Sequence, residues 1–393
     1  MRGKDVCVTQ LFCPEINSGV NPPLGHNDVV DLTGLGDAHR RLVLTLLQHG
    51  PLQRRDLAHR LGLSGGSITR LTKPLQERGL VVATAEQRNA AGRPAHTLDA
   101  VLPADTLLGV SVSTHTLRLV RTDLRARVLE DLSGPLASRH PEAVVERLAL
   151  LVDRLAPAPT VGIGIGVSGI VHDGSTVVRS PFLRWADVPL AELVSQRLGH
   201  PCVVANDVAA VALAEAWFGL GLTAQSFLAL TFGTGVGGAA VVRGEVQDAE
   251  AQGIGLLGHL PLIWPDGSVR RANVSLTDSA LVTLARGYGS AATTADAVEA
   301  GADAGARRAA AEFAYACGAL TGTGSAFLVP DAVVVLGERA GLVAAFADDF
   351  EAGIASVREA VAPPLAVTVR PHNRDVWARG AAVTALVRHV SGL

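Results

Sequence analysis

The stretch TFGTGVGG, residues 231–238, decides the fold. The apolar run 227–232 comes first, and the turn Gly233, Thr234, Gly235 follows. Because its two glycines have no side chain, a ligand or a second strand can approach the backbone there. A plain tight turn between strands is the alternative. Around this stretch, apolar strand-like runs alternate with helical stretches, which predicts an α/β architecture. The strand-like runs are 107–112, 161–167, 227–232 and 332–336, and the helical stretches are 141–155, 188–198 and 306–320.

The composition is typical of a globular protein of two or three domains. The chain has 393 residues, of which 48% are hydrophobic. It contains no run of about 20 apolar residues and no basic leader before an apolar core, so we expect a cytoplasmic protein with no membrane contact. Four scattered cysteines lack the paired spacings of a zinc or disulfide framework. Residues 1–36 show no sustained periodicity and are expected to form an N-terminal extension.

The segment from Asp37 to Leu98 has a different character. It carries ten basic and four acidic residues, a charge of +6, which leaves −9 for the rest of a chain whose total is −3. Leucines mark two helices there, which end near Gly50 and Gly62, and a third helix follows Ser64. Helices across a tight glycine turn predict a helix-turn-helix. The residues expected to contact DNA from the third helix are Ser64, Ser67, Thr69, Arg70 and Lys73.

Two strand-like runs, 80–84 and 95–98, follow the third helix and predict a wing. Its tip contains Arg88 and Arg93, which we expect to contact phosphates or a minor groove. A small three-helix domain with solvated arginines is the alternative. Pro74 falls inside the third helix, where it should kink or shorten the helix because it removes a backbone donor.

We call the segment 37–99 the head. After it, five stretches occur in the order and at the intervals of a known family: 161–171, 180–190, 205–210, 231–238 and the pair Gly258-His259. On these stretches the chain resembles the ROK family of repressors and sugar kinases, within the actin/hexokinase-like superfamily. The resemblance implies a two-lobed α/β body behind the winged helix-turn-helix. We expect the head over 37–99, a first lobe over 105–226 plus 376–393, and a second lobe over 227–375.

The resemblance also implies which residues face the cleft between the lobes. Asp207 matches the catalytic base of the kinases, which takes a proton from a sugar hydroxyl. It also precedes the run 208–216 and could simply cap that helix. His259 matches a sugar-contacting histidine, which could instead be an ordinary interior or loop residue. The residues expected at an effector are Asn206, Asp207, His259, Phe182, Leu256 and Gly169, beside a vestigial phosphate turn of Gly233, Thr234 and Gly235.

Several groups that the kinases use are missing. Ser111 stands at the position of a metal-organising aspartate, and Leu256 replaces a sugar-contacting glutamate. The stretch 264–278 contains none of the three cysteines of the family's zinc loop, and one histidine cannot supply a tetrahedral site. A glycine-rich turn on the adenosine side is reduced to residues 336–338. We therefore expect no metal, no ATP cofactor and no catalysis.

These features predict a DNA-binding transcriptional regulator, most simply a repressor, whose kinase-like body binds a sugar or sugar derivative. The expected partners are operator DNA and the effector, in a homodimer or homotetramer suited to a palindromic operator. Two alternatives stay open. One is an ATP-dependent sugar kinase with an accessory head, and the other is a repressor that binds DNA without a ligand.

Overall fold

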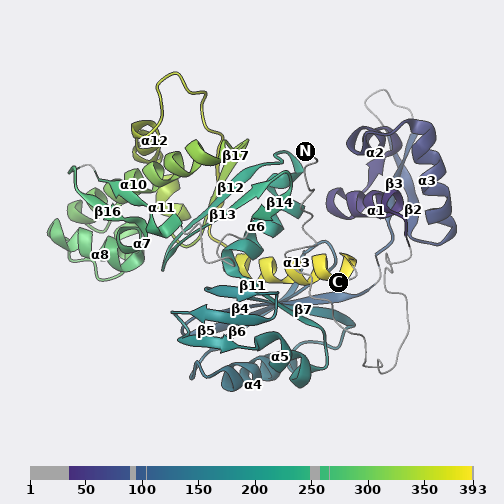
Figure 1. Cartoon of the computed structure of the whole chain (residues 1–393), viewed down its shortest axis with the longest axis horizontal. Helices are drawn as coiled ribbons and strands as arrows, with labels where there is room; N and C mark the ends of the chain where they lie inside the picture. The colour runs from purple at the N-terminus through teal and green to yellow at the C-terminus, as the bar shows by residue number, and fades with distance from the viewer. Residues whose placement is uncertain (1–34, 89–93, 103, 248–256, 265, 392–393) are drawn as a thin grey trace, which may run out of the picture.

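The computed structural model describes residues 35–391 except 89–93, 103, 248–256 and 265. Figure 1 shows a small head joined to a larger body, which is built around two five-stranded sheets. Leu256 and Arg93 lie outside the described residues, as does the extension through residue 34. Within the described part, no helix is long and apolar enough to cross a membrane.

The head has three helices and a three-stranded sheet. The helices are α1 (Asp37–His49), α2 (Arg54–Leu61) and α3 (Gly65–Glu77), and the strands β1 (Leu52–Gln53), β2 (Val81–Arg88) and β3 (Pro94–Ala100) pair in the order β1-β3-β2. Gly62 ends α2 in the left-handed conformation, with φ of 66°, where glycine carries no steric penalty. The predicted winged helix-turn-helix is confirmed, with β1 as an additional strand.

Pro74 was expected to kink or shorten the third helix, and the part of this expectation that concerns shortening is wrong. Helix α3 continues through Pro74 for three more residues to Glu77. On either side of the proline, Thr72 and Leu75 are almost fully buried, at 1% and 0% exposure. Their packing against the head core offsets the one backbone hydrogen bond that proline removes.

The first sheet of the body has the order β11-β7-β4-β5-β6. Its parallel half consists of β4 (Thr106–Val112), β7 (Thr160–Val167) and β11 (Cys202–Asn206), and its antiparallel half adds β5 (Thr116–Thr122) and β6 (Val128–Pro135). Helices α4 (Pro141–Val152) and α5 (Leu190–Leu198) lie on one face, and α13 (Val376–Ser391) lies on the other (Figure 1). A small antiparallel sheet, β8 (Ile170–His172), β9 (Thr176–Ser180) and β10 (Trp185–Val188), adjoins β11.

The second sheet has the order β14-β13-β12-β17-β18. Its strands are β12 (Phe227–Phe232), β13 (Val236–Val242), β14 (Glu245–Gln247), β17 (Ala332–Leu336) and β18 (Val367–Val369). Around it lie a hairpin of β15 (Pro261–Ile263) and β16 (Val269–Arg271), the 3-10 turns η2 (Leu220–Leu222) and η3 (Leu257–His259), and several helices. These helices are α7 (Ala272–Ser275), α8 (Asp278–Gly287), α9 (Ala295–Glu299), α10 (Ala304–Leu328), α11 (Ala340–Ala345) and α12 (Ala347–Ser356).

Strand β12 shows how the second sheet is held between helices. Leu228 and Leu230 pack in the core that contains residues of α10, whereas Phe227 and Ala229 pack in the core that contains residues of α6 (Asp207–Phe218). This alternation follows the two-residue period of a strand that is buried on both faces. Helix α6 also contacts α13, which covers the first sheet. The helix that starts at Asp207 therefore connects the two halves of the body.

Candidate functional site

Asn206 fixes the floor of the predicted cleft. It is the last residue of β11, and its Oδ1 accepts hydrogen bonds from the backbone N–H groups of Val208 (2.9 Å) and Ala209 (3.1 Å). Its Nδ2 donates to the carbonyl oxygen of Gly169 at 3.1 Å. A side-chain oxygen that accepts from the first free amides is a standard helix cap. Asn206 thus starts α6 and ties the loop at Gly169 to it, which brings two of the predicted site residues together.

Asp207 is the first residue of α6 and is not its cap, because Asn206 fills that position. The Asp207 carboxylate accepts a hydrogen bond from the N–H of Val208 at 2.9 Å, and the side chain is partly accessible. Burial raises the pKa of Asp207 to about 6, against the effect of that hydrogen bond, and the nearby carboxylate of Glu338 raises it further. The carboxyl groups of Asp207 and Glu338 therefore lie close to each other.

The glycine-rich turn between β12 and β13 lies beside these carboxylates. A Cβ atom at Gly233 would lie 1.9 Å from Oε2 of Glu338, and one at Gly235 would lie 3.7 Å from Cζ of Phe182. Phe182 precedes β10, in the first half of the body, and its side chain is 44% exposed. The structure thus brings Phe182, the predicted phosphate turn and Glu338 into one site.

His259 has a less defined position. It ends the short turn η3, which packs against β13, and its side chain is exposed. The neighbouring Leu257 contacts the core of the second sheet, where its Cδ1 would lie 2.1 Å from a Cβ atom at Gly238. His259 is therefore an exposed residue of a turn near the glycine-rich strand, and its contact with an effector stays a prediction.

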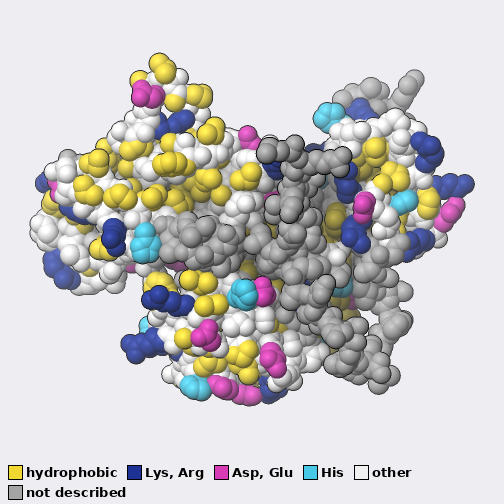
Figure 2. All heavy atoms as spheres, in the orientation of Figure 1, with side chains coloured by type: hydrophobic (Ala, Val, Ile, Leu, Met, Phe, Trp, Pro, Cys, Tyr) yellow, Lys and Arg dark blue, Asp and Glu magenta, His cyan; other side chains and the backbone are white. Residues whose placement is uncertain are grey.

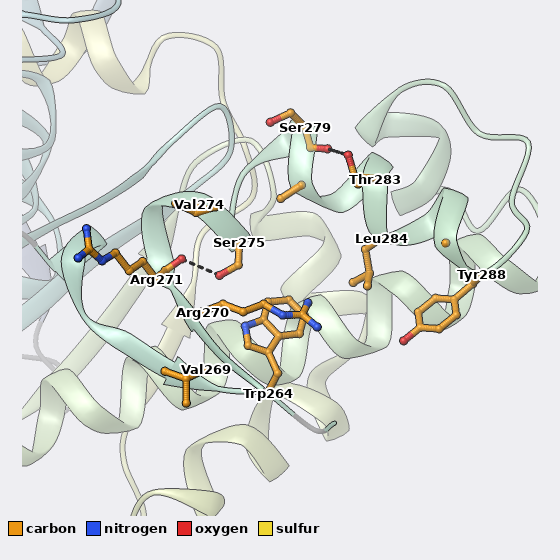
Figure 3. A pocket seen from close by; sticks show the side chains of 12 residues that line it. Trp264, Val269, Arg270, Arg271, Val274, Ser275, Ser279, Thr283, Leu284 and Tyr288 are labelled. Carbon is orange, nitrogen blue, oxygen red and sulfur yellow. Dashed lines mark hydrogen bonds between the residues drawn. The ribbon is translucent and has the colours of Figure 1, made fainter. Parts of the chain in front are cut away.

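The stretch 264–278, which matches the zinc loop of the family, contains strand β16 of the β15-β16 hairpin and helix α7, and it ends at the first residue of α8. The guanidinium carbon of Arg270 lies 4.3 Å from the centre of the Trp264 ring, and Arg270 forms an ion pair with Asp266 at 2.7 Å. Figure 3 shows Trp264 and Arg270 at a pocket of about 770 Å³, which is also lined by Leu284 of α8 and by Tyr288 just after this helix. Stacking and an ion pair thus hold this hairpin, and no metal-sized cluster of His, Cys, Asp or Glu occurs among the described residues.

Five of the seven predicted DNA-contacting residues cap α3 or lie on it. Ser64 caps the helix, with its Oγ accepting from the N–H of Ser67 at 3.2 Å, and Thr69 bonds back to the carbonyl of Gly65 at 3.1 Å. Arg70 and Lys73 are exposed on the same helix. Figure 2 shows Lys and Arg side chains along the outer edge of the head, away from the body. Arg88 ends β2, and its side chain is not among those described.

Sequence reasoning missed Glu338 as a site residue. The only signal was the shortened glycine turn at residues 336–338, which was interpreted as a loss and not as a new group. It also missed Arg339, whose guanidinium forms ion pairs with Asp278 (3.1 Å), Asp296 (2.5 Å) and Glu299 (2.5 Å). These partners are up to 61 residues away along the chain, so no local pattern could indicate them.

A family model described as "ROK family" matches residues 108–387, well over half of the chain. The chain belongs to the ROK family. A second model, described as "Winged helix-turn-helix DNA-binding", matches residues 36–82. Together, these matches cover the head and body of this ROK protein and confirm the family and fold class expected from its sequence.

Curated relatives are similar to this chain in sequence, and a solved structure is similar to it in fold. The ROK chain is 24% identical over 256 residues to the xylose repressor of Caldicellulosiruptor bescii, covering 63% of this chain and 64% of the relative. It is 24% identical over 220 residues to the regulator NagC of Escherichia coli, covering 54% of each. It thus spans less than two thirds of either relative. The crystal structure of a ROK family transcriptional regulator, a homolog of the E. coli MLC protein, superposes with a TM-score of 0.70 at 20% identity, over 91% of this chain and 98% of that one.

We expect Asp207→Asn to stabilise the folded chain by about 1–3 kcal/mol at pH 8 and to leave its stability unchanged at pH 4. Burial raises the pKa of Asp207 to about 6, so the folded state holds a proton more tightly than the unfolded chain does. The protonated Asp207 therefore stabilises the folded state fully below about pH 4, and this contribution is lost as the pH rises through about 6. Asparagine stays neutral and keeps an acceptor for the N–H of Val208.

Melting temperatures at pH 4, 6 and 8 test this prediction. The exposed Asp348 on α12 provides the control, and Asp348→Asn should shift melting little at any of these pH values. Equal melting of Asp207→Asn and the unchanged chain at pH 8 would contradict the prediction.

Proposed function

We propose that this ROK protein is a transcriptional repressor whose winged head binds operator DNA and whose cleft binds a sugar or sugar derivative without transferring phosphate. The observation that carries the proposal is the combination of an exposed basic recognition helix with a kinase-like cleft that keeps Asp207 while a carboxylate covers its phosphate turn. The similarity to a xylose repressor and to an N-acetylglucosamine repressor supports a sugar effector.

The geometry argues against phosphoryl transfer. In-line transfer needs backbone amides and cations around the phosphates. Here Ser111 stands on β4 where the resembling kinases carry an aspartate, and Glu338 lies against Gly233. Asp207 could still accept a hydrogen bond from a sugar hydroxyl, which is a binding role. We therefore assign Asp207 to effector recognition and give it no catalytic step.

The head and body share a packed interface through which a ligand could act. Arg125, in the loop after β5, donates to the carbonyl oxygens of Leu47 (3.3 Å) and Leu46 (3.4 Å) in α1 and forms an ion pair with Asp99 in β3. One apolar cluster also contains head leucines together with Leu386 of α13. A ligand that favours one arrangement of the two body halves would thereby favour one placement of the heads.

DNA binding to the region upstream of the gene tests the proposal. We expect the full chain to bind one fragment from this region more tightly than a scrambled fragment of equal length at fixed salt, since non-specific binding does not depend on the DNA sequence. D-xylose, N-acetylglucosamine and related sugars are then added one at a time, and one of them should release the fragment. Asp207→Asn should bind the same fragment and resist release.

Each alternative gives a different result. Formation of ADP and a sugar phosphate from ATP and a sugar, with a requirement for Asp207, would establish a kinase. Specific binding that no sugar releases, together with no ligand-induced shift in melting, would establish a ligand-independent repressor. If the chain shows no preference for the upstream fragment at any salt concentration, the proposal that it is a transcriptional regulator is wrong.

A further inference from the structure

Glu338 occupies an unusual position over the glycine-rich turn. A Cβ atom at Gly233 would meet Oε2 of Glu338 at 1.9 Å, Cδ at 2.9 Å and Cβ at 3.2 Å, so the acidic side chain lies flat against this glycine. A backbone stripped of side chains is suited to the close approach of a phosphate group. In this protein, a carboxylate fills the space that such a phosphate would need.

The backbone around Glu338 is held on both sides. Gly337 has φ of 92°, and a Cβ atom there would lie 2.6 Å from the carbonyl oxygen of Phe232, so only glycine fits. The N–H of Arg339 donates to that same carbonyl at 2.9 Å. The Arg339 guanidinium, 6% exposed, is fixed by three acidic side chains. Glu338 is therefore anchored in place between two immobile neighbours.

Glu338 lies close to two other carboxyl groups. It raises the pKa of Asp207 and also that of Asp278, in each case after burial as the main cause. Arg339, the adjacent cation, points to other partners, and the described residues give Glu338 itself no ion pair. A phosphate dianion entering the turn would meet this carboxylate at short range, where like charges repel strongly in a partly desolvated site.

Phe182 limits the turn from the other side. Its ring lies near Gly235 and the residue is 44% exposed, so it offers an apolar surface beside the two carboxylates. Such a surface packs against the C–H face of a pyranose, while carboxylates accept hydrogen bonds from hydroxyl or ammonium groups. The site therefore matches a polyol with donors and without a phosphate.

We infer that Glu338 is a specificity-determining residue that excludes phosphate-bearing ligands from the cleft, so that the effector is an uncharged sugar or an amino sugar. This inference rests on the proposed effector site and narrows its ligand class. It applies equally to a nucleotide, a sugar phosphate or free phosphate, because the shared group is the phosphate.

Calorimetric titration of the full-length chain tests this inference without any DNA. The probes are inorganic pyrophosphate, glucose 6-phosphate and the ATP analogue adenylyl imidodiphosphate with Mg²⁺, which distinguish free, sugar-borne and nucleotide phosphate. We expect Glu338→Gln, which keeps the shape, and Glu338→Gly, which opens the turn, to bind at least one probe at least tenfold more tightly than the unchanged chain does. Glu351→Gln, at an exposed position of α12, should change nothing.

The outcomes separate this inference from the proposed function. If both Glu338 variants melt normally yet bind every probe within twofold of the unchanged chain, the exclusion role is wrong. It is also wrong if the unchanged chain binds a phosphate probe as tightly as Glu338→Gly does. A chain that fails to bind operator DNA would overturn the regulator but leave these titrations interpretable.

Discussion

Replacing Gly164 with alanine should destabilise the body by at least about 4 kcal/mol, because helix α13 rests directly on the backbone of strand β7. A Cβ atom at Gly164 would lie 1.7 Å from the carbonyl oxygen of Ala381 and 2.5 Å from its carbonyl carbon. Both are backbone atoms of a buried helix and cannot rotate away. The helix would have to lift from the sheet, with loss of the close packing beneath it.

The same strand provides a matched control. Gly162 is also buried and faces α13, but the nearest atoms to a Cβ there, in Ala385 and Pro201, are 3.7 Å away. Alanine should therefore fit at Gly162 and leave stability unchanged or raise it by up to about 1 kcal/mol, because it restricts the unfolded chain. Scanning calorimetry should show melting roughly 8 °C or more lower for Gly164→Ala and unchanged or higher for Gly162→Ala. Equal melting of the two variants would show that α13 can shift without cost.

The sequence predicted the fold where one local pattern sufficed. Leucines at helical spacing and glycines at two helix ends located α1 to α3, and apolar runs located β4 and β7 of the first sheet and β12 and β17 of the second. The prediction that Pro74 would shorten α3 failed because the helix is held there by the packing of Thr72 and Leu75, and their burial is a property of the folded head. Likewise, nothing local to Gly164 indicates that a helix more than 200 residues later lies against it.

The candidate site was predicted in part. The sequence indicated the pair Asn206 and Asp207 and the glycine-rich turn, because each is a contiguous motif. Phe182 was expected near an effector, and the structure places it across from Gly235. Glu338 was not expected there, because its role depends on how β17 lies beside β12. The contact of Arg125 with α1 was also missed, since an arginine in a loop has no sequence feature that indicates its partner.

Changes at the exposed face of α3 should have the largest effect on operator binding. Arg70 and Lys73 lie one turn apart on this helix and are both exposed. Ser67 lies one turn before Arg70, and its Oγ is 3.5 Å from the Arg70 guanidinium, which orients the side chain along the helix. An arginine that reads a guanine edge contributes about 1–3 kcal/mol of discrimination, whereas a lysine on a phosphate contributes without regard to sequence.

We therefore expect Arg70→Ala and Lys73→Ala to weaken operator binding in different ways. Arg70→Ala should reduce affinity for the operator roughly 10- to 100-fold and reduce its preference over scrambled DNA. Lys73→Ala should weaken both DNAs equally and lower the slope of log affinity against log salt by about 0.9. The double variant should lose roughly 100-fold or more. Arg286→Ala, at an exposed site on α8, removes the same charge far from the head and should change neither quantity. Anisotropy titrations at several salt concentrations distinguish these effects, and an equal loss of preference in Arg70→Ala and Arg286→Ala would show that α3 does not read the operator.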